Sequence, residues 1–231
     1  MFDIASRARR VVLALFCSLS FSLAVFAEPP CLSISGIPKF GDVTKVIENA
    51  RKIFDAAGIC ARFSALPLRR SEQLLLDGKL DGELLRTDVW AEMFKAYAVA
   101  VPTPLHRDRM MALSLQTRKR SFGKLEDLKG YRVMIIGGHR WAEVKTKALG
   151  IEAVPATTQE RFVALVRLGR VDVGLVEESL LPLLEDDSGI QVEPIAAIYY
   201  HIVLRREHEG LVSALDKALK DFLSNGEPRY W

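Results

Sequence analysis

The segment with the clearest chemical potential is Gly137-Gly138-His139-Arg140-Trp141, which lies between a predicted strand and a predicted helix. Glycines let a backbone approach a bound group closely, and the first N–H groups of a helix attract anions. Arg140 adds a positive charge at the same place. We therefore predict that this loop contacts an anionic group of a ligand. The alternative is a glycine-rich turn with a solvated His139 and Arg140. No Lys-Ser or Lys-Thr follows, so the pattern excludes a nucleotide P-loop.

A carboxylate follows another predicted strand. Glu177 comes directly after the strand Val171–Val176. An acidic side chain at such a position suits a cationic group of a ligand, because hydrogen bonds between charged groups are strong. Glu177 and Glu178 can also be read as surface charges at the start of a helix.

The sequence offers little for catalysis. It lacks the Gly-x-Ser-x-Gly and His-Glu-x-x-His patterns. Two cysteines and scattered histidines make a poor metal site. We predict a protein that is not an enzyme and that holds no metal or cofactor. The four histidines are dispersed at His106, His139, His201 and His208.

Residues 1–27 predict a secretory signal peptide. Three arginines precede the apolar run Val11–Phe26, and Val25-Phe26-Ala27 predicts cleavage after Ala27. The run is shorter than the roughly 20 residues that a membrane-spanning helix needs. We expect export to the periplasm.

Predicted cleavage of the signal peptide changes both the number of cysteines and the net charge. Cleavage leaves Cys31 and Cys60, and an even pair in an exported chain predicts a disulfide, which in the loop-entropy model contributes about 3 kcal/mol. Two free thiols are the alternative. Removal of three arginines and Asp3 from 32 basic and 29 acidic residues leaves 29 against 28, a charge of +1. A chain so close to neutral lacks the excess of basic residues that is typical of nucleic-acid-binding proteins.

Strands and helices alternate along the rest of the chain, which predicts α/β architecture with mainly parallel sheets covered by helices. The first set is a strand 32–37, a helix 42–57, a strand 59–64, a helix 68–77, a strand 82–85 and a helix 88–96. The second set is a strand 132–136, a helix 141–149, a strand near 154, a helix 158–168, a strand 171–176 and a helix 180–185. Extended segments at 99–101, 110–115 and 195–204 and a final helix 211–223 complete the prediction.

A short pattern occurs once in each set. Gly78-Lys79-Leu80-Asp81 and Gly169-Arg170-Val171-Asp172 each follow an apolar helical segment. In each, glycine suits the left-handed position after a helix, and the aliphatic residue opens the next strand. The repetition predicts two lobes of similar plan with a ligand cleft between them.

Three segments carry a resemblance to a known family. Leu125–Val133 resembles the L-x-D-L-K-G-x-R-V entry to the second lobe of family 3 extracellular solute-binding proteins, the periplasmic receptors of amino-acid ABC transporters. Phe162–Leu175 resembles the A-L-x-x-G-x-V-D-A segment of that family, and Leu211–Leu223 resembles its terminal helix. The resemblance implies a type II periplasmic-binding-protein-like fold. Its lobe 1 would comprise 28–105 and 198–231, and its lobe 2 would comprise 106–197.

The resemblance also implies ligand contacts. In the family, a Ser/Thr-x-Thr-x-x-Arg stretch supplies an arginine that clamps a carboxylate, but no arginine lies three residues after Thr87. Arg86 can replace the clamp or form a salt bridge on the cleft rim, and Thr87 can simply cap a helix. Thr158 can likewise cap a helix, and Phe40 and Trp90 can pack in the core. The ligand residues implied beside the glycine loop are Phe40, Arg70, Arg86, Thr87, Trp90, Thr158 and Glu177.

The sequence therefore predicts a monomeric periplasmic protein that closes on an amino acid or organic anion and delivers it to a membrane permease. A ligand-sensing subunit for a membrane signalling protein would use the same cleft. A third alternative is a periplasmic dehydratase-like enzyme, in which Glu177 and His139 perform acid–base chemistry.

Overall fold

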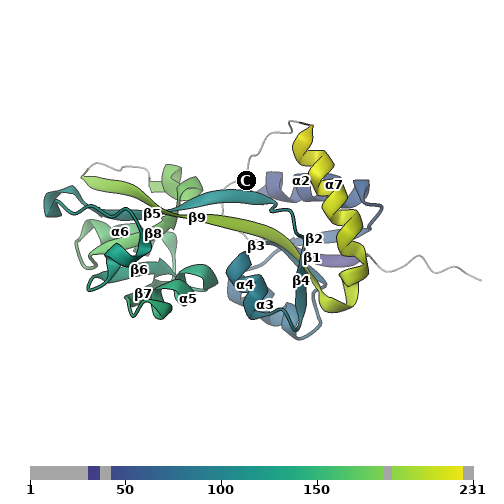
Figure 1. Ribbon diagram of the computed structural model, residues 1–231, viewed down its shortest axis with the longest axis horizontal. Coiled ribbons are helices and arrows are strands. Elements are labelled where there is room, and N and C mark those ends of the chain that lie inside the picture. The colour runs from purple at the N-terminus through teal and green to yellow at the C-terminus, as the bar shows by residue number, and fades with distance from the viewer. Residues whose placement is uncertain (1–30, 37–42, 185–188, 226–231) are drawn as a thin grey trace, which may run out of the picture. The chain divides into compact units, whose positions relative to one another are not determined.

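The computed structural model describes residues 31–36, 43–184 and 189–225 (Figure 1). The predicted signal peptide at 1–27, its cleavage after Ala27 and the candidate ligand residue Phe40 lie outside these residues. Within the described part of the chain, no helix is both long enough and apolar enough to cross a membrane.

The first set of elements forms as the alternation predicts. Strand β1 pairs in parallel with β2 on one side and with β3 on the other, as expected for strands connected through helices. The elements are β1 (Leu32–Gly36), α2 (Val43–Ala56), β2 (Ala61–Ala65), α3 (Leu68–Leu76), β3 (Gly82–Thr87), α4 (Asp88–Met93) and β4 (Ala98–Ala100).

The second set repeats this plan, with β6 parallel to both β7 and β8. The segment predicted as a helix at 180–185 is instead the 3-10 helix η3, which contains Pro182, a residue that cannot donate the α-helical hydrogen bond. The elements are β5 (His106–Leu115), η1 (Gln116–Arg118), η2 (Leu125–Leu128), β6 (Arg132–Ile136), α5 (Arg140–Ala148), β7 (Glu152–Ala156), α6 (Gln159–Arg167), β8 (Val173–Glu177), η3 (Glu178–Leu184), β9 (Ile190–Arg205), η4 (Arg206–Leu211) and α7 (Val212–Ser224).

One mixed sheet connects both sets, with the order β2-β1-β3-β9-β5-β8-β6-β7 and with β4 on β9. Strands β5 and β9 lie side by side in antiparallel register and run between the two sets (Figure 1). The predicted boundary at 105/106 falls where β5 begins, and the one at 197/198 falls inside β9.

Strand β5 begins four residues before the predicted start at Met110. The charged segment that suggested a turn alternates in exposure instead, with Arg107 and Arg109 exposed and His106 and Asp108 partly buried. This is the period-2 pattern of a strand with one covered face. The alternation therefore directs His106 and Asp108 toward the interior.

The repeated pattern has the same structural role in both sets. Gly78 and Gly169 end α3 and α6 with φ of +74° and +63°. Asp81 accepts a hydrogen bond from the Ser33 backbone N–H at 2.7 Å, and Asp172 accepts one from the Arg132 backbone N–H at 2.9 Å. Each aspartate thereby fixes the first strand of its set beside the third.

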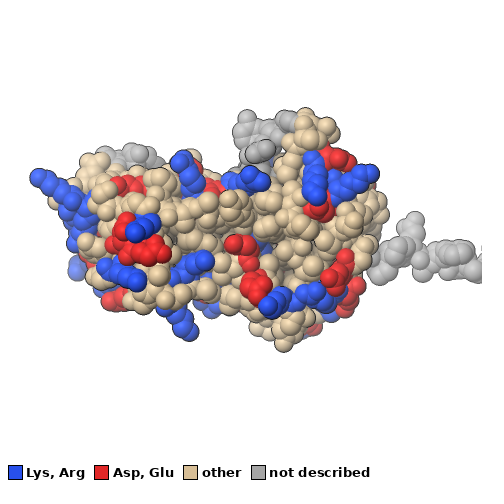
Figure 2. Space-filling model, in the orientation of Figure 1, with Lys and Arg blue, Asp and Glu red and all other residues tan. Residues whose placement is uncertain are grey.

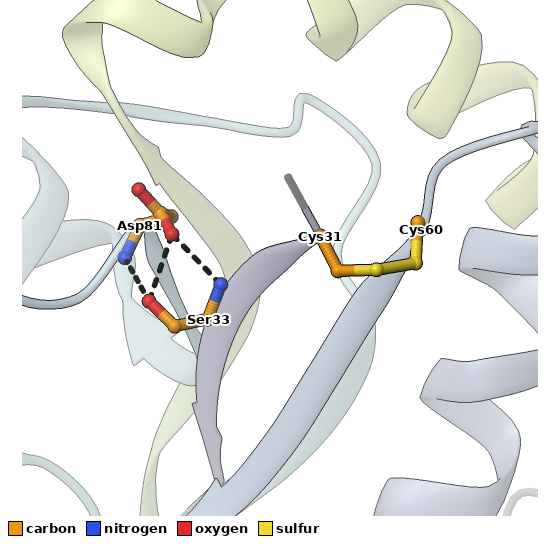
Figure 3. The surroundings of a disulfide bond; sticks show 4 residues. All are labelled: Cys31, Ser33, Cys60 and Asp81. Carbon is orange, nitrogen blue, oxygen red and sulfur yellow. Dashed lines mark hydrogen bonds between the residues drawn. A yellow bond between two sulfur atoms is a disulfide. The ribbon is translucent and has the colours of Figure 1, made fainter. Parts of the chain in front are cut away.

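The predicted disulfide between Cys31 and Cys60 is confirmed (Figure 3). Because β1 and β2 are parallel with Leu32 opposite Ala61, the two cysteines that precede them are also opposite. Their Cα atoms are 4.6 Å apart, and the Leu32 N–H donates to the Cys60 carbonyl. The disulfide thus ties together the starts of two adjacent strands.

Charged side chains are mixed on the face of the molecule in Figure 2. Lysines and arginines alternate with aspartates and glutamates there, and no patch of one sign dominates that face.

We predict that loss of the disulfide lowers stability without changing the fold. Replacing both Cys31 and Cys60 with serine should lower the free energy of unfolding by about 3 kcal/mol, because the unfolded chain regains the freedom that the closed loop removes. Urea unfolding followed by circular dichroism measures the change. Reduction of the wild-type protein is the matched comparison, and equal stability with and without reductant would contradict the prediction.

Candidate ligand-binding site

Seven of the eleven predicted ligand residues line one cavity of about 40 Å³. A cavity of this volume has room for roughly three water molecules. The seven residues are Arg86, Thr87, Trp90, Gly138, His139, Arg140 and Glu177, and the cavity is also lined by Leu68, Leu85, His106, Asp108, Ser179 and Tyr200.

A β-bulge in β3 sets the position of Arg86. In a regular strand, residues three apart face opposite sides, but the pairing of β3 with β9 shifts register between Glu83 and Arg86. Both side chains therefore face the same side. Leu85, within the bulge, has φ of +59°, a conformation that leucine rarely adopts. Strain of this kind is typical of binding sites, where the surroundings enforce it.

Arg86 forms a buried salt bridge with Glu83 rather than a salt bridge on the rim. Its Nε and Nη2 donate to the two Glu83 carboxylate oxygens at 2.9 and 2.6 Å, and both residues are buried. Nη2 also donates to the Leu68 carbonyl and to Ser71 Oγ. The guanidinium lies over the Trp90 ring, 5.0 Å from its centroid.

Thr87 and Trp90 are held by α4. The Thr87 hydroxyl accepts a hydrogen bond from the Trp90 backbone N–H and caps the helix, while the Trp90 ring is buried. Thr87 therefore has a capping role at the edge of the cavity.

Backbone N–H groups at the start of α5 find their hydrogen-bond acceptors within the chain itself. His139 Nδ1 accepts a hydrogen bond from the Ala142 backbone N–H, and the Gly138 N–H donates to Glu143. Gly138 has φ of +91°, and a Cβ placed on it would lie 3.2 Å from Arg69 Cγ. Only glycine fits this close approach of the loop to α3 without strain.

Arg140 pairs with carboxylates on two helices. It binds Glu72 of α3 through Nε and Nη2 and Glu143 of its own helix through Nη1. Glu72 also accepts a hydrogen bond from Trp90 Nε1 at 2.8 Å, and Glu143 pairs with Arg69. The anions bound by Arg140 of the predicted loop are thus Glu72 and Glu143 of the chain itself.

The pairing with Arg140 keeps Glu72 ionised. Burial by itself raises the pKa of Glu72, but hydrogen bonds from Arg140 and Trp90 and the positive charges of Arg140 and Arg86 lower this pKa below 4.5. The hydrogen bond from Arg140 to Glu72, together with the negative charges of Glu72 and Glu143, raises the pKa of Arg140 above its ordinary value, although burial lowers it.

The sheet supplies a second polar group, formed by Glu177, Tyr200 and His139. The Tyr200 hydroxyl donates to Glu177 Oε1 at 2.9 Å, and His139 Nε2 lies 2.8 Å from the same oxygen. Burial by itself raises the pKa of Glu177, but His139 and Tyr200 lower this pKa below 4.5. For Tyr200, burial and then the negative charges of Glu177 and Asp108 raise the pKa well above its usual range.

Sequence reasoning missed the contribution of β5 and its neighbours. Ser179 Oγ donates to Asp108 Oδ2 at 2.7 Å, and the His106 ring stacks on Tyr200 at 5.9 Å between centroids. The alternation His106-x-Asp108-x-Met110 is the pattern that could have predicted this strand face. Arg107 and Arg109 obscure it, because they make the segment resemble a charged turn.

Three predicted residues lie apart from the cavity lining. Arg70 is exposed on α3, Trp141 is buried in the hydrophobic core, and Thr158 caps α6 by accepting the Arg161 N–H. A separate group with reach for a metal ion consists of Asp81, Glu207 and His208. There, however, Asp81 already accepts hydrogen bonds from Ser33 and lies 3.0 Å from His208 Nε2.

Neither a protein-family model nor a curated protein matches this chain. Solved structures do match it. One is an amino acid ABC transporter substrate-binding protein, AbpA from Streptococcus pneumoniae Canada MDR_19A, bound to L-arginine. It has 17% identity and a TM-score of 0.66, with 85% of this chain and 90% of that chain covered. The chain has the periplasmic-binding-protein fold.

Two further structural neighbours are not described as transporter substrate-binding proteins. The GluR0 ligand-binding core in complex with L-glutamate has 12% identity and a TM-score of 0.68, and 86% of this chain and 94% of that chain are covered. A histidine kinase sensor domain with similarity to periplasmic binding proteins has 17% identity, a TM-score of 0.67 and coverage of 85% and 92%. At these identities the likeness concerns the fold.

We predict that Arg86 is required for stability. Arg86→Met leaves Glu83 charged and buried without its partner, which should lower the free energy of unfolding by about 3–5 kcal/mol. Urea unfolding measures the change. In the exposed pair of Lys95 and Glu92, Lys95→Met should change stability by less than about 1 kcal/mol. Wild-type stability in Arg86→Met would contradict the buried pairing.

We also predict an acid-dependent contribution from Glu72. Because its pKa is lowered on folding, its contribution is present above about 4.5, the unfolded value, and is lost as pH falls below it. The stability difference between wild type and Glu72→Gln should therefore shrink from pH 6 to pH 3. Urea unfolding at both pH values tests this, with the exposed Glu92→Gln as control. A difference that stays constant or grows in acid would contradict the prediction.

Proposed function

We propose that this chain is a periplasmic solute-binding protein that closes two lobes on a small polar solute and delivers it to an ABC permease. The observation that carries the proposal is the cavity, which brings together polar residues from β3, α5, β5, β8 and β9. Lobe 1 would comprise 28–105 and 198–231, and lobe 2 would comprise 106–197.

The ligands of the neighbours support this proposal. AbpA was solved with L-arginine and the GluR0 core with L-glutamate. The disulfide suits an oxidising compartment outside the cytoplasm. Export of a monomer through a cleaved signal peptide completes the proposed route.

Closure would involve the ion pairs between α3 and α5. Glu72 and Arg140, and Arg69 and Glu143, hold the two helices together over the cavity. A solute enters when these pairs separate, and it shifts the population toward the closed form by its extra affinity for that form. The side chains of the cavity therefore bind and position a solute, without a chemical step.

A sensor role is the second candidate. The likeness to a histidine kinase sensor domain favours it, since such a protein would use the same closure to signal to a membrane partner. The two roles differ in the partner that recognises the closed form.

The binding function predicts stabilisation and compaction by an unchanged ligand. A thermal-shift screen of amino acids, amines and carboxylates should reveal at least one compound that adds about 2.7 kcal/mol at 100 times its dissociation constant. Small-angle scattering should then show a smaller radius of gyration. The decrease should be larger in Glu72→Gln, because that variant loses a contact that favours closure without a solute.

Mass spectrometry of the ligand after incubation separates binding from catalysis. Quantitative recovery of the unchanged compound is the expected result. Steady conversion that stops in Glu177→Gln would instead identify an enzyme, and the absence of any stabilising compound would contradict the binding function.

A further inference from the structure

We propose that the cavity selects a small solute that carries a positive charge and no free carboxylate, such as a primary ammonium compound. This inference rests on the proposed binding function. The sequence predicts an amino acid or an organic anion as the ligand. The structure favours a cationic ligand without a carboxylate instead.

The positive charges at the cavity are already neutralised by the chain. Arg86 is bound by both carboxylate oxygens of Glu83, and Arg140 is bound by Glu72 and by Glu143. A carboxylate ligand would have to displace one of these bidentate or double contacts. Bidentate pairing between arginine and carboxylate is among the strongest hydrogen-bonded arrangements in proteins, so displacement is unfavourable.

Two carboxylates at the cavity have no arginine or lysine side chain as partner among the described residues. Glu177 accepts a hydrogen bond from Tyr200 and lies 2.8 Å from His139 Nε2. Asp108 accepts hydrogen bonds from the Ser179 hydroxyl and from the Arg109 backbone N–H, and its Oδ2 lies 3.6 Å from His106 Nε2. Because no described guanidinium binds either carboxylate, both can accept a cationic group of a ligand.

His139 and Tyr200 hold Glu177 in place without an arginine or a lysine. The Nδ1 of His139 accepts the Ala142 N–H that begins α5, and its Nε2 lies 2.8 Å from Glu177 Oε1. The side-chain contacts of Glu177 are thus made by an imidazole and a phenol.

Strand register places the two carboxylates on one face of the sheet. Met110 of β5 is opposite Glu177 of β8, and Asp108 lies two residues before Met110. The side chains of Asp108 and Glu177 are therefore diagonal neighbours on adjacent strands. The negative charges of both reach Tyr200, whose pKa they help to raise.

Carboxylates outnumber arginines at the site. The side chains of these two kinds that line the cavity, or that pair with a lining residue or with its partner, comprise three arginines and five carboxylates. A cationic ligand reduces this excess of carboxylates, whereas a carboxylate ligand increases it, and like charges repel strongly in a water-poor site. The arginines are Arg69, Arg86 and Arg140, and the carboxylates are Glu72, Glu83, Asp108, Glu143 and Glu177.

Three probes of similar size separate the possibilities. Ethanolammonium has an amine and a hydroxyl, glycine has the same amine with a carboxylate, and glycolate has the hydroxyl with the carboxylate. Isothermal titration calorimetry of the purified full chain at pH 7.5 measures the three dissociation constants.

We expect ethanolammonium to bind at least tenfold more tightly than glycine, and glycolate to show no binding. Glu177→Gln and Asp108→Asn should each weaken ethanolammonium binding about tenfold or more, because each removes one of the two negative charges. Glutamine keeps an acceptor for Tyr200 and His139, and circular dichroism checks that each variant is folded. The exposed Glu126→Gln is the matched control and should bind within about twofold of wild type.

Two results would overturn the inference while leaving a binding function in place. One is glycine or glycolate binding as tightly as ethanolammonium. The other is unchanged ethanolammonium affinity in the double variant Glu177→Gln/Asp108→Asn. If none of the three probes binds but another amine of the thermal-shift screen does, the inferred class stands; if only compounds with a free carboxylate bind, that class is wrong and the binding function stands. If nothing binds, both fail.

Discussion

The candidate site depends on the requirement that every buried charge has a partner. A charged side chain removed from water is strongly destabilising unless an opposite charge or several hydrogen bonds replace its hydration. Here Arg86, Glu83, Glu72 and Glu177 are all buried, and each has a partner. Arg86 and Glu83 pair within β3, whereas Glu72 and Glu177 pair with residues of other elements. The bulge in β3, the strained Leu85 and the glycine at 138 are the backbone solutions that bring these partners together.

This pairing would give a ligand-binding site a particular selectivity. An arginine that already holds a glutamate offers little to an incoming anion, whereas a carboxylate held by hydroxyls and imidazoles can still attract a cation. Recognition in this chain would therefore be decided by the groups behind the cavity wall as much as by those that face it. A residue-type comparison with related folds would find Arg86 and miss Glu83, which changes what Arg86 can do.

The sequence predicts the elements well and the partners poorly. The helices α2 and α7 and the parallel strands follow from their apolar periods, and the disulfide follows from the even pair of cysteines left by the predicted signal-peptide cleavage. The register shift in β3 could not be predicted, because nothing in Gly82–Thr87 marks the extra residue. Without that shift, Glu83 and Arg86 would face opposite sides of the sheet. The alternation of a regular strand therefore could not predict their salt bridge.

The same limit applies to contacts distant in sequence. Glu72 and Arg140 are 68 residues apart, and only the packing of α3 against the start of α5 brings them together. Local patterns identified the loop at 137–141 and the capping role open to Thr87. They could not identify His106 and Asp108, since the two arginines between and beside them concealed the strand.

The position of β9 in the sheet has a consequence for the order in which the chain folds. Strand β3 has β9 as its neighbour, and Gly82 is paired with Leu204, more than a hundred residues later in the sequence. During synthesis, one edge of β3 therefore stays unpaired until β9 has emerged, and an open edge is a site of misassembly. Cys31 and Cys60 both precede β3 in the sequence, so their disulfide can form long before β9 is synthesised. The early covalent link would then keep β1 and β2 in register while the first set waits for its final strand.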